Sequence, residues 1–313
     1  MLVMAILVTG GAGFIGFSLA KRLAEADHQV IIFDKSIGRI EAEKEENMIL
    51  VQGDIANLED LEKICTDHSV DTIFHLAAIL PPLTEEDPYL AFKVNVEGTL
   101  NILKIAGKCN VQTIIYPSSA TVFGPDRMPP FTEEDLTNPW TVYSAFKICS
   151  EILGSVFSRK KNINFRAVRL PVVIGPGRDR MLGMTKYPVE MVEDTVRGRP
   201  YTVEVDPETK VPIIYIDDAV QVLINLWRLK EDAFEIYNID GLWVTARELA
   251  EGVKKVIPSA EIKFKPSKDE ILEKAVSNLQ EKQEESKFGF RSKRVLDEIL
   301  QEYVSRLSTS EEE

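Results

Sequence analysis

The stretch from residue 2 to residue 16 constrains this chain more than any other. An apolar run, residues 2–8, leads into the sequence TGGAGFIG at residues 9–16, and a helical pattern follows at once. This order predicts a buried strand, a tight glycine turn and the start of a helix. Gly10 permits the turn, Gly13 lets backbone N–H groups approach a pyrophosphate, and Gly16 lets the helix pack against the strand. We therefore expect phosphates at the positive end of that helix, the alternative being a glycine turn without a ligand.

Asp34 is the next informative residue, at the end of a second predicted strand over residues 29–34. A carboxylate at this place accepts the hydroxyls of an adenosine ribose and repels a 2′-phosphate, which favours NAD over NADP. Two alternatives stay open. Asp34 could be a solvated residue that closes a strand, and Lys35 and Arg39 could host a phosphate.

The composition limits the classes of partner. The 313 residues are 44% hydrophobic, enough for a large core in one or two domains. A formal charge of −13 argues against a broad nucleic-acid or anionic-membrane surface. The N-terminal apolar run is too short for a transmembrane helix and lacks the features of a signal peptide. We therefore expect a cytoplasmic protein that binds neither nucleic acid nor membrane.

The cysteines and histidines indicate no metal site. Cys65, Cys109 and Cys149 lie far apart without paired spacing, so we expect reduced core thiols. His75 lies in an apolar strand pattern and is expected to pack in the core.

Strands and helices alternate through the first half of the chain, which predicts an α/β fold with a doubly wound parallel sheet of the Rossmann type. The predicted strands cover residues 2–8, 29–34, 48–54, 72–78, 113–119 and 164–170. Long helices are expected over residues 88–109 and 143–158. We place a dinucleotide-binding domain at residues 1–171 and a smaller substrate-binding lobe at residues 172–313, with residues 212–240 returning to the first sheet.

The second half breaks this alternation. We expect a strand over residues 212–216, Asp217 as the cap of a helix through residue 229, and a capping box from Thr245 to Glu248. A short strand at residues 262–265, helices at 268–285 and 295–307, and a disordered tail at 308–313 complete the prediction.

Two polar residues have more than one interpretation. Asp54 follows the third strand at the ligand-binding edge of the sheet, so Asp54 and Ile55 are candidates for adenine contacts, and a helix-capping role for Asp54 is the alternative. Asn95 lies within an apolar helical pattern, where it would either satisfy a local backbone bulge or join a proton path.

Tyr143, Lys147 and Ser119 form the candidate catalytic set. The four-residue spacing puts Tyr143 and Lys147 on one helix face, and Ser119 ends the fifth strand. A phenol of ordinary pKa is a poor base at neutral pH, but a nearby ammonium and a positively charged nicotinamide favour the phenolate. Tyr143 would then remove a hydroxyl proton while the C–H hydride moves to the cofactor, and Ser119 would donate a hydrogen bond to the substrate oxygen.

The glycine turn TGGAGFIG, the sequence SSATVFG at residues 118–124 and the pair Tyr143-x-x-x-Lys147 resemble the extended short-chain dehydrogenase/reductase family, also called the NAD-dependent epimerase/dehydratase family. The resemblance covers the chain to about residue 257. It implies the catalytic set above and a homodimer joined through the helices at 88–109 and 143–158. The cofactor contacts that it implies are Gly10, Gly13, Phe14, Ile15, Gly16, Asp34, Asp54, Ile55, Leu76, Ala77, Ala78, Asn95, Tyr143, Lys147 and Pro171.

The branch of the family is harder to assign. Sugar-nucleotide epimerases usually carry an Asn and an Arg for the diphosphate where this chain has Val172 and Val211. Residues 183–191 and 208–219 resemble the short-chain L-threonine 3-dehydrogenases, in which the match to Thr185 helps hold the substrate carboxylate. Pro81 departs from that group, since a substrate-binding Ser is usual there, and Met184 and Lys186 replace a Thr and an Asp.

Three functions follow as hypotheses. The first is an NAD-dependent dehydrogenase for a small hydroxy or amino acid, with Ser119, Tyr143 and Thr185 holding a substrate that we expect to be anionic. The second is a nucleotide-sugar epimerase, dehydratase or reductase, such as a UDP-glucose 4-epimerase. The third is an NAD-binding sensor without turnover. Basic residues that suit an anionic substrate, although surface charge explains at least half of them, are Arg178, Arg180, Lys186 and Arg197.

Overall fold

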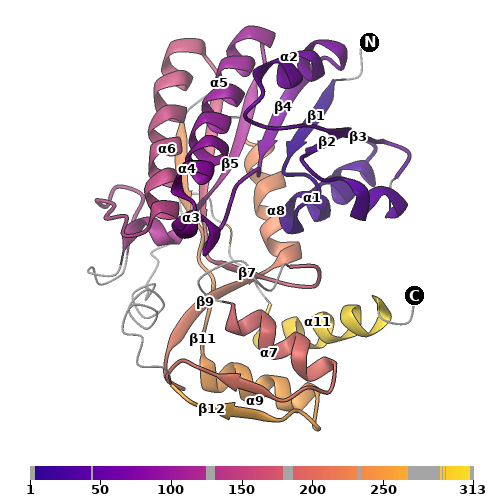
Figure 1. Ribbon diagram of the computed structural model, residues 1–313, viewed down its shortest axis with the longest axis vertical. Coiled ribbons are helices and arrows are strands. Elements are labelled where there is room, and N and C mark those ends of the chain that lie inside the picture. The colour runs from indigo at the N-terminus through magenta and orange to yellow at the C-terminus, as the bar shows by residue number, and fades with distance from the viewer. Residues whose placement is uncertain are drawn as a thin grey trace. The chain divides into compact units, whose positions relative to one another are not determined.

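The computed structural model describes residues 4–43, 45–124, 131–178, 186–230, 234–266, 290, 292 and 294–310. The chain divides into two units (Figure 1). The first comprises the residues up to Ser119, Thr141–Arg169 and Ala219–Tyr237. The second comprises Ala120–Trp140, Leu170–Asp218 and the residues from Asn238 onward. The boundary at residue 171, with residues 212–240 returning to the first sheet, stays a prediction. In the structure Ala219–Tyr237 belongs to the first unit and Ala120–Trp140 belongs to the second.

A seven-stranded sheet forms the centre of the first unit, in the order β10-β6-β5-β4-β1-β2-β3. The pairs of β1 with β2 and β4, of β2 with β3 and of β4 with β5 are parallel. The order reverses direction between β1 and β4, which is the place where such sheets bind ligands at the carboxyl ends of their strands. The α/β doubly wound fold is therefore confirmed. The strands are β1 (Ala5–Thr9), β2 (Gln29–Asp34), β3 (Met48–Gln52), β4 (Val70–His75), β5 (Thr113–Ser119), β6 (Asn164–Leu170) and β10 (Glu235–Asn238).

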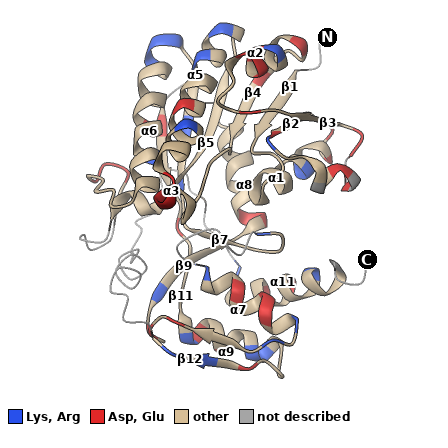
Figure 2. Cartoon of the chain, in the orientation of Figure 1, with Lys and Arg blue, Asp and Glu red and all other residues tan. Residues whose placement is uncertain are grey.

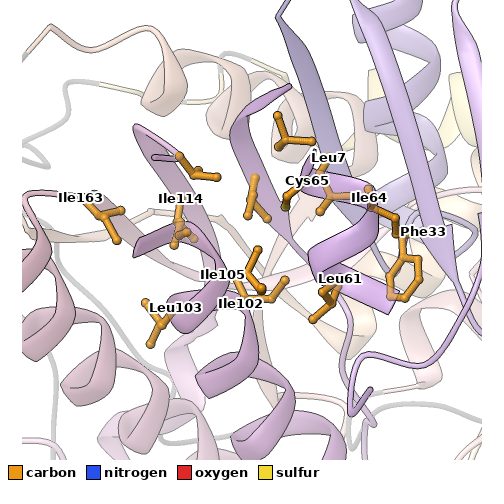
Figure 3. Packing of buried hydrophobic residues seen from close by; sticks show 14 of the residues in the cluster. Leu7, Phe33, Leu61, Ile64, Cys65, Ile102, Leu103, Ile105, Ile114 and Ile163 are labelled. Carbon is orange, nitrogen blue, oxygen red and sulfur yellow. The ribbon is translucent and has the colours of Figure 1, made fainter. Parts of the chain in front are cut away.

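Helices cover both faces of this sheet, because alternate strand residues point to opposite sides. Ile73 belongs to a buried cluster with residues of the second and fifth helices, part of which is drawn in Figure 3. The next residue, Phe74, packs on the other side against Trp227 with ring centroids 6.1 Å apart. The helical segments of this unit are α1 (Phe14–Ala24), η1 (Gly38–Glu43), α2 (Leu58–Asp67), α3 (Leu83–Glu86), α4 (Pro88–Phe92), η2 (Lys93–Glu97), α5 (Gly98–Cys109), α6 (Val142–Lys161) and most of α8 (Ile216–Trp227).

The run predicted as one helix from residue 88 to residue 109 consists of three segments. The α-helices α4 and α5 are joined by η2, a turn of π-helix. A π-turn inserts one extra residue into the hydrogen-bond pattern and often marks a functional site. Asn95 lies within it.

Among the described residues, the second unit contains two small sheets and the helices η3, α7, α9 and α11. Its three-stranded sheet has the order β11-β9-β7, and its two-stranded sheet pairs β12 with β8 in parallel. β9 therefore lies outside the seven-stranded sheet, and only β10 of the expected returning segment joins it. The elements of this unit are η3 (Ala120–Phe123), β7 (Val172–Ile174), α7 (Tyr187–Val196), β8 (Tyr201–Val203), β9 (Lys210–Tyr215), β11 (Leu242–Thr245), α9 (Ala246–Val256), β12 (Ile262–Phe264) and α11 (Leu296–Ser310).

Three local predictions in this region have clear outcomes. The capping box from Thr245 to Glu248 is confirmed. The helix expected to be capped by Asp217 begins one residue earlier, at Ile216, so Asp217 lies in its first turn and its carboxylate accepts from Arg306 at 3.0 Å. The tail prediction is wrong for residues 308–310, because α11 continues to Ser310. The helix expected at 268–285 lies outside the described residues.

Candidate active site

The glycine turn between β1 and α1 forms a shallow backbone cradle. Gly10 has a φ of +64°, a conformation that side chains with a Cβ rarely adopt. A Cβ on Gly10 would lie 2.6 Å from the backbone nitrogen of Ala77, and a Cβ on Gly16 would collide with the carbonyl oxygen of Gly10. The turn therefore packs directly against the chain that leaves β4 and excludes side chains at both positions.

The N-terminus of α1 opens on this cradle. Gly13 is its N-cap and supplies no side-chain hydrogen bond, and the first turn carries no acidic residue. Phe14 and Ile15 are the first residues of the helix, and both are half-buried. An uncapped helix start beside a glycine turn suits an anion such as a diphosphate, because backbone N–H groups and the helix dipole point toward it.

Asp34 is fixed beside the cradle at the carboxyl end of β2. Its Oδ2 accepts a hydrogen bond from the Ala12 backbone N–H at 3.1 Å, and its Oδ1 accepts from the Ser36 N–H at 3.1 Å. A carboxylate has about four acceptor positions, so two remain for ribose hydroxyls. This geometry is what a dinucleotide with an unmodified adenosine ribose requires.

Asp54 and Ile55 follow β3. The hydrogen bond from the Ala56 backbone lowers the pKa of Asp54 most, and the Lys35 ammonium, at 3.2 Å from Oδ2, lowers it further. The cap of α2 is Asn57, which accepts from Glu59 at 3.0 Å, so the capping alternative for Asp54 is wrong. The Ile55 side chain is buried against α5, so its contact with an adenine would involve the backbone. These adenine contacts stay predictions.

Asn95 is committed to the backbone that follows β4. Its Oδ1 accepts from the Ile79 N–H at 2.7 Å, and its Nδ2 donates to the Ile79 carbonyl at 2.9 Å. Because the Asn95 side chain pairs with both the N–H and the carbonyl of Ile79, it supports the preceding segment Leu76–Ala77–Ala78 next to the cradle. The structure thus favours the backbone-support interpretation of Asn95 over the proton path, and a cofactor contact at Asn95 stays a prediction.

Lys147 joins α6 to the end of β5. Its side chain is buried, and Nζ donates to the Pro117 carbonyl at 2.6 Å, two residues before Ser119. Nζ also lies 5.5 Å from the ring centroid of Tyr143 and 4.6 Å from that of Tyr116. The structure therefore brings Lys147 and Tyr143 together and ties Lys147 to the strand that carries Ser119. Ser119 and Tyr143 are half-buried.

Burial controls the charge of Lys147. Removal from water lowers its pKa from 10.5 to about 7, while the negative charge of Glu151 opposes this shift. His75 lies buried nearby, and burial, together with the Lys147 charge, lowers its pKa to about 3. His75 is therefore neutral at physiological pH and bridges Thr9, at 2.8 Å from Nδ1, to Thr99, at 3.0 Å from Nε2.

A buried ion pair between Glu151 and Arg169 lies next to the end of β5. Glu151 and Arg169 are only 3% and 4% exposed. The Arg169 guanidinium donates to both carboxylate oxygens, at 3.0 and 2.8 Å, and the Ser118 hydroxyl donates to Oε1 at 2.5 Å. Sequence analysis missed this pair, although Glu151 lies one turn beyond Lys147 on the same helix face, and that spacing is the signal that could have found it.

The remaining predicted site residues are not joined to this group. Pro171 belongs to the second unit, between β6 and β7, and Thr185 lies outside the described residues, as does Arg180. Three basic residues have partners in the second unit: Arg178 donates to the Val173 carbonyl, Lys186 pairs with Glu190, and Arg197 pairs with Glu193. The structure therefore gives no support for an anionic substrate from these residues.

These features together define a dinucleotide-binding α/β enzyme fold, and comparison with known proteins identifies its class. Residues 6–240 match the model of the NAD dependent epimerase/dehydratase family, so the chain belongs to that family. Its cofactor is NAD, and the cradle at Gly10, the open start of α1 and the fixed carboxylate of Asp34 fit that molecule.

The similar proteins include L-threonine 3-dehydrogenases, UDP-glucose 4-epimerases and uncharacterized epimerase/dehydratases of Staphylococcus. The chain is 28% identical to the mitochondrial L-threonine 3-dehydrogenase of Sus scrofa over 83% of this chain and 70% of that protein. A solved structure of UDP-glucose 4-epimerase from Thermotoga maritima has a TM-score of 0.87 and 25% identity, covering 98% of this chain and 99% of that one. A monomeric L-threonine 3-dehydrogenase from a metagenome has a TM-score of 0.81 and 28% identity, covering 97% and 99%.

The described residues show neither a metal site nor a membrane-spanning helix. No group of acidic, histidine and cysteine side chains there is arranged to hold a metal ion. Within the same part of the chain, no helix is both long and apolar enough to span a membrane. The three cysteines are free thiols, and Cys65 is buried.

Proposed function

We propose that this protein is an NAD-dependent dehydrogenase acting on a secondary alcohol of a small hydroxy or amino acid, with L-threonine as the model substrate. The observation that carries the proposal is the arrangement of Lys147, held on the Pro117 carbonyl at 2.6 Å with its ammonium 5.5 Å from the Tyr143 ring centroid. Proton transfer needs a phenol beside a buried amine, whereas binding of NAD alone does not, which argues against an NAD sensor.

The chain's own residues would share the work as follows. Tyr143 takes the hydroxyl proton of the substrate as the alcohol is oxidised, because the Lys147 ammonium stabilises the phenolate. Ser119, at the end of β5, donates a hydrogen bond to the substrate oxygen. Lys147 also holds the ribose nearest the reacting ring. When bound, NAD supplies the nicotinamide that accepts hydride from the alcohol carbon.

Two observations favour a small substrate over a sugar nucleotide. Val211, which stands where sugar-nucleotide epimerases usually carry an Arg, is fully buried in β9 opposite Val244. Val172, in the place of the usual Asn, is an aliphatic residue in β7. Neither side chain can pair with a diphosphate. Pro81 does not support the threonine-dehydrogenase assignment, because it is buried and has no hydroxyl to offer a substrate.

UDP-glucose 4-epimerase activity is the second candidate, because the Thermotoga maritima epimerase shares the fold at a TM-score of 0.87. The two activities differ in net redox change. A dehydrogenase releases NADH into solution, whereas an epimerase returns the electrons to its substrate and keeps the cofactor oxidised.

The test is to mix the purified protein with NAD⁺ and L-threonine, or with UDP-glucose, and to follow NADH absorbance and sugar composition. We expect NADH to accumulate with L-threonine or a related hydroxy acid. Interconversion of UDP-glucose without NADH would transfer the assignment to the epimerase, and no reaction with any member of a hydroxy-acid and sugar-nucleotide panel would favour the sensor.

We also propose a homodimer formed through α4, α5 and α6. Support comes from large apolar side chains that are exposed on α4 and α6, including Tyr89 at 71% and Ile152 at 59%. Exposed apolar groups on adjacent helices favour association.

A further inference from the structure

The N-terminus of α6 needs more hydrogen-bond acceptors than its own sequence provides. The first four N–H groups of any α-helix have no partner within the helix. Thr141 accepts from the Ser144 N–H at 3.1 Å, and the Ser144 hydroxyl accepts from the Thr141 N–H at 3.0 Å. This capping box leaves the N–H groups of Val142 and Tyr143, the first two residues of the helix, to be satisfied from elsewhere.

Glu85, on the short helix α3, supplies both missing acceptors. Its Oε2 accepts from the Val142 N–H at 3.2 Å, and its Oε1 accepts from the Tyr143 N–H at 3.3 Å. The Thr84 hydroxyl donates to the same Oε1 at 3.1 Å, which limits the rotation of the carboxylate. One side chain thus closes the first turn of the helix that carries Tyr143 and Lys147.

The charge of Glu85 also suits this place. The first turn of α6 contains no acidic residue, while its last turn carries Arg159, Lys160 and Lys161. Figure 2 shows the basic residues at one end of α6 and acidic residues of α3 beside the other end. A carboxylate at the positive end of a 20-residue helix stabilises it, and Glu85 provides that carboxylate from a separate segment.

We propose that Glu85 is a positioning residue for Tyr143: it closes the α6 N-terminus from outside and thereby fixes the backbone from which the phenol projects. This inference rests on the proposed function, in which Tyr143 transfers the substrate proton. Tyr143 lies in the first turn, where helices fray most easily, so its placement depends on the cap. A misplacement of about 1 Å can cost up to about 100-fold in rate, so a cap at this point affects turnover.

Three variants separate this role from general stability. Glu85→Ala removes both acceptors, Glu85→Gln keeps one acceptor oxygen and the length of the side chain, and Glu86→Ala removes the neighbouring exposed carboxylate as a matched control. Amide hydrogen exchange at Val142 and Tyr143 measures directly how well Glu85 protects these two N–H groups. We expect about tenfold faster exchange in Glu85→Ala, a smaller increase in Glu85→Gln, and no change in Glu86→Ala.

Steady-state kinetics of the full chain measure the effect of each variant on turnover. The assay contains NAD⁺ and whichever of L-threonine or UDP-glucose the wild type turns over. We expect kcat and kcat/KM of Glu85→Ala to fall together by about tenfold, with KM and the NAD⁺ dissociation constant unchanged, and partial rescue in Glu85→Gln. Unchanged exchange or unchanged kcat in Glu85→Ala, or an equal loss in Glu86→Ala, would overturn the inference.

A Tyr143→Phe variant distinguishes failure of this inference from failure of the proposed function. If Tyr143→Phe is inactive while Glu85→Ala is fully active, the positioning role alone is wrong. If Tyr143→Phe keeps full activity, the proposed function is wrong and the positioning role fails with it, whatever exchange shows about the cap.

Discussion

Lys147 shows at the scale of one residue how burial determines chemistry. Protonating a buried amine costs free energy. The Pro117 carbonyl, the Tyr116 ring and the Glu151 carboxylate stabilise the protonated form of Lys147. The spacing from Tyr143 to Lys147 was visible in the sequence. The carbonyl that orients the amine and the depth of its burial were not, because both depend on β5 and α6 meeting in space.

The lowered pKa of Lys147 predicts a specific pH dependence of stability. Between pH values of about 7 and 10.5 the unfolded chain binds a proton at this residue that the folded chain has released. The free energy of unfolding should therefore rise with pH across that window, relative to a Lys147→Met variant that lacks the group. Below the folded pKa of about 7, the full cost of burying the charge is present and the difference is constant.

Urea unfolding of both proteins at a series of pH values checks this prediction. A difference between wild type and Lys147→Met that does not change with pH would show that the amine stays protonated in the folded protein.

Individual elements differed in how far the sequence could predict them. β2, β5 and β6 were predicted with their observed bounds. β2 and β5 are mainly apolar runs that end in polar residues, and β6 ends directly before Pro171. The three-residue strands β7 and β8 were missed because a run this short shows little periodicity, whereas the equally short β12 was predicted. The π-turn at η2 was also missed, because a π-turn and an α-helix share nearly the same apolar spacing.

Some residues of the candidate site could be predicted from the sequence and others could not. Gly10, Asp34, Tyr143 and Lys147 could be found because the chemistry requires those residue types at regular positions. Glu85 could not be found, because its acceptors serve an α6 amide 58 positions away in the sequence.

The close packing of the glycine cradle predicts that one added methyl group at Gly16 weakens both NAD⁺ binding and stability. A Cβ on Gly16 would collide with the Gly10 carbonyl, whereas a Cβ on Gly38 would meet nothing within 4 Å. We expect Gly16→Ala to weaken NAD⁺ binding at least about tenfold and to destabilise the fold by about 1–3 kcal/mol. Gly38→Ala should leave both properties near wild type. Calorimetric titration with NAD⁺ and thermal unfolding measure the two effects, and equal behaviour of the two variants would contradict the cradle.

The buried pair between Glu151 and Arg169 predicts a large loss of stability when one partner is removed. Glu151→Gln leaves a buried guanidinium without its counter-charge, and we expect a loss of about 3–5 kcal/mol. The exposed pair of Lys108 with Glu62 is the control, because Lys108→Ala should cost less than about 1 kcal/mol. Chemical denaturation of the two variants makes the comparison, and similar losses would show that burial does not determine the strength of these pairs.

At the scale of the whole molecule, the glycine cradle and the candidate catalytic residues Ser119, Tyr143 and Lys147 all belong to the first unit. The first unit is also the part whose alternating strand and helix pattern allowed the fold class to be predicted. The second unit has short strands and residues from three distant parts of the sequence, so its architecture could not be predicted from local patterns.

The proposed homodimer gives a prediction at this scale. A charge at Ile152, on the exposed face of α6, should disrupt a dimer formed there, so Ile152→Glu should sediment as a monomer while wild type sediments as a dimer. Val295→Glu is the matched control, since Val295 is 55% exposed in the second unit. A monomeric wild type would contradict the proposal, as would a dimer that survives Ile152→Glu.

As we propose, Tyr143 transfers the substrate proton, while most of the binding of NAD comes from the other cofactor contacts. The direct test compares wild type with Tyr143→Phe in NAD⁺ binding by calorimetry and in turnover with the active substrate. We predict an NAD⁺ dissociation constant within about twofold of wild type and a loss of turnover of about 100- to 10,000-fold. Turnover at the wild-type rate in Tyr143→Phe would contradict the account.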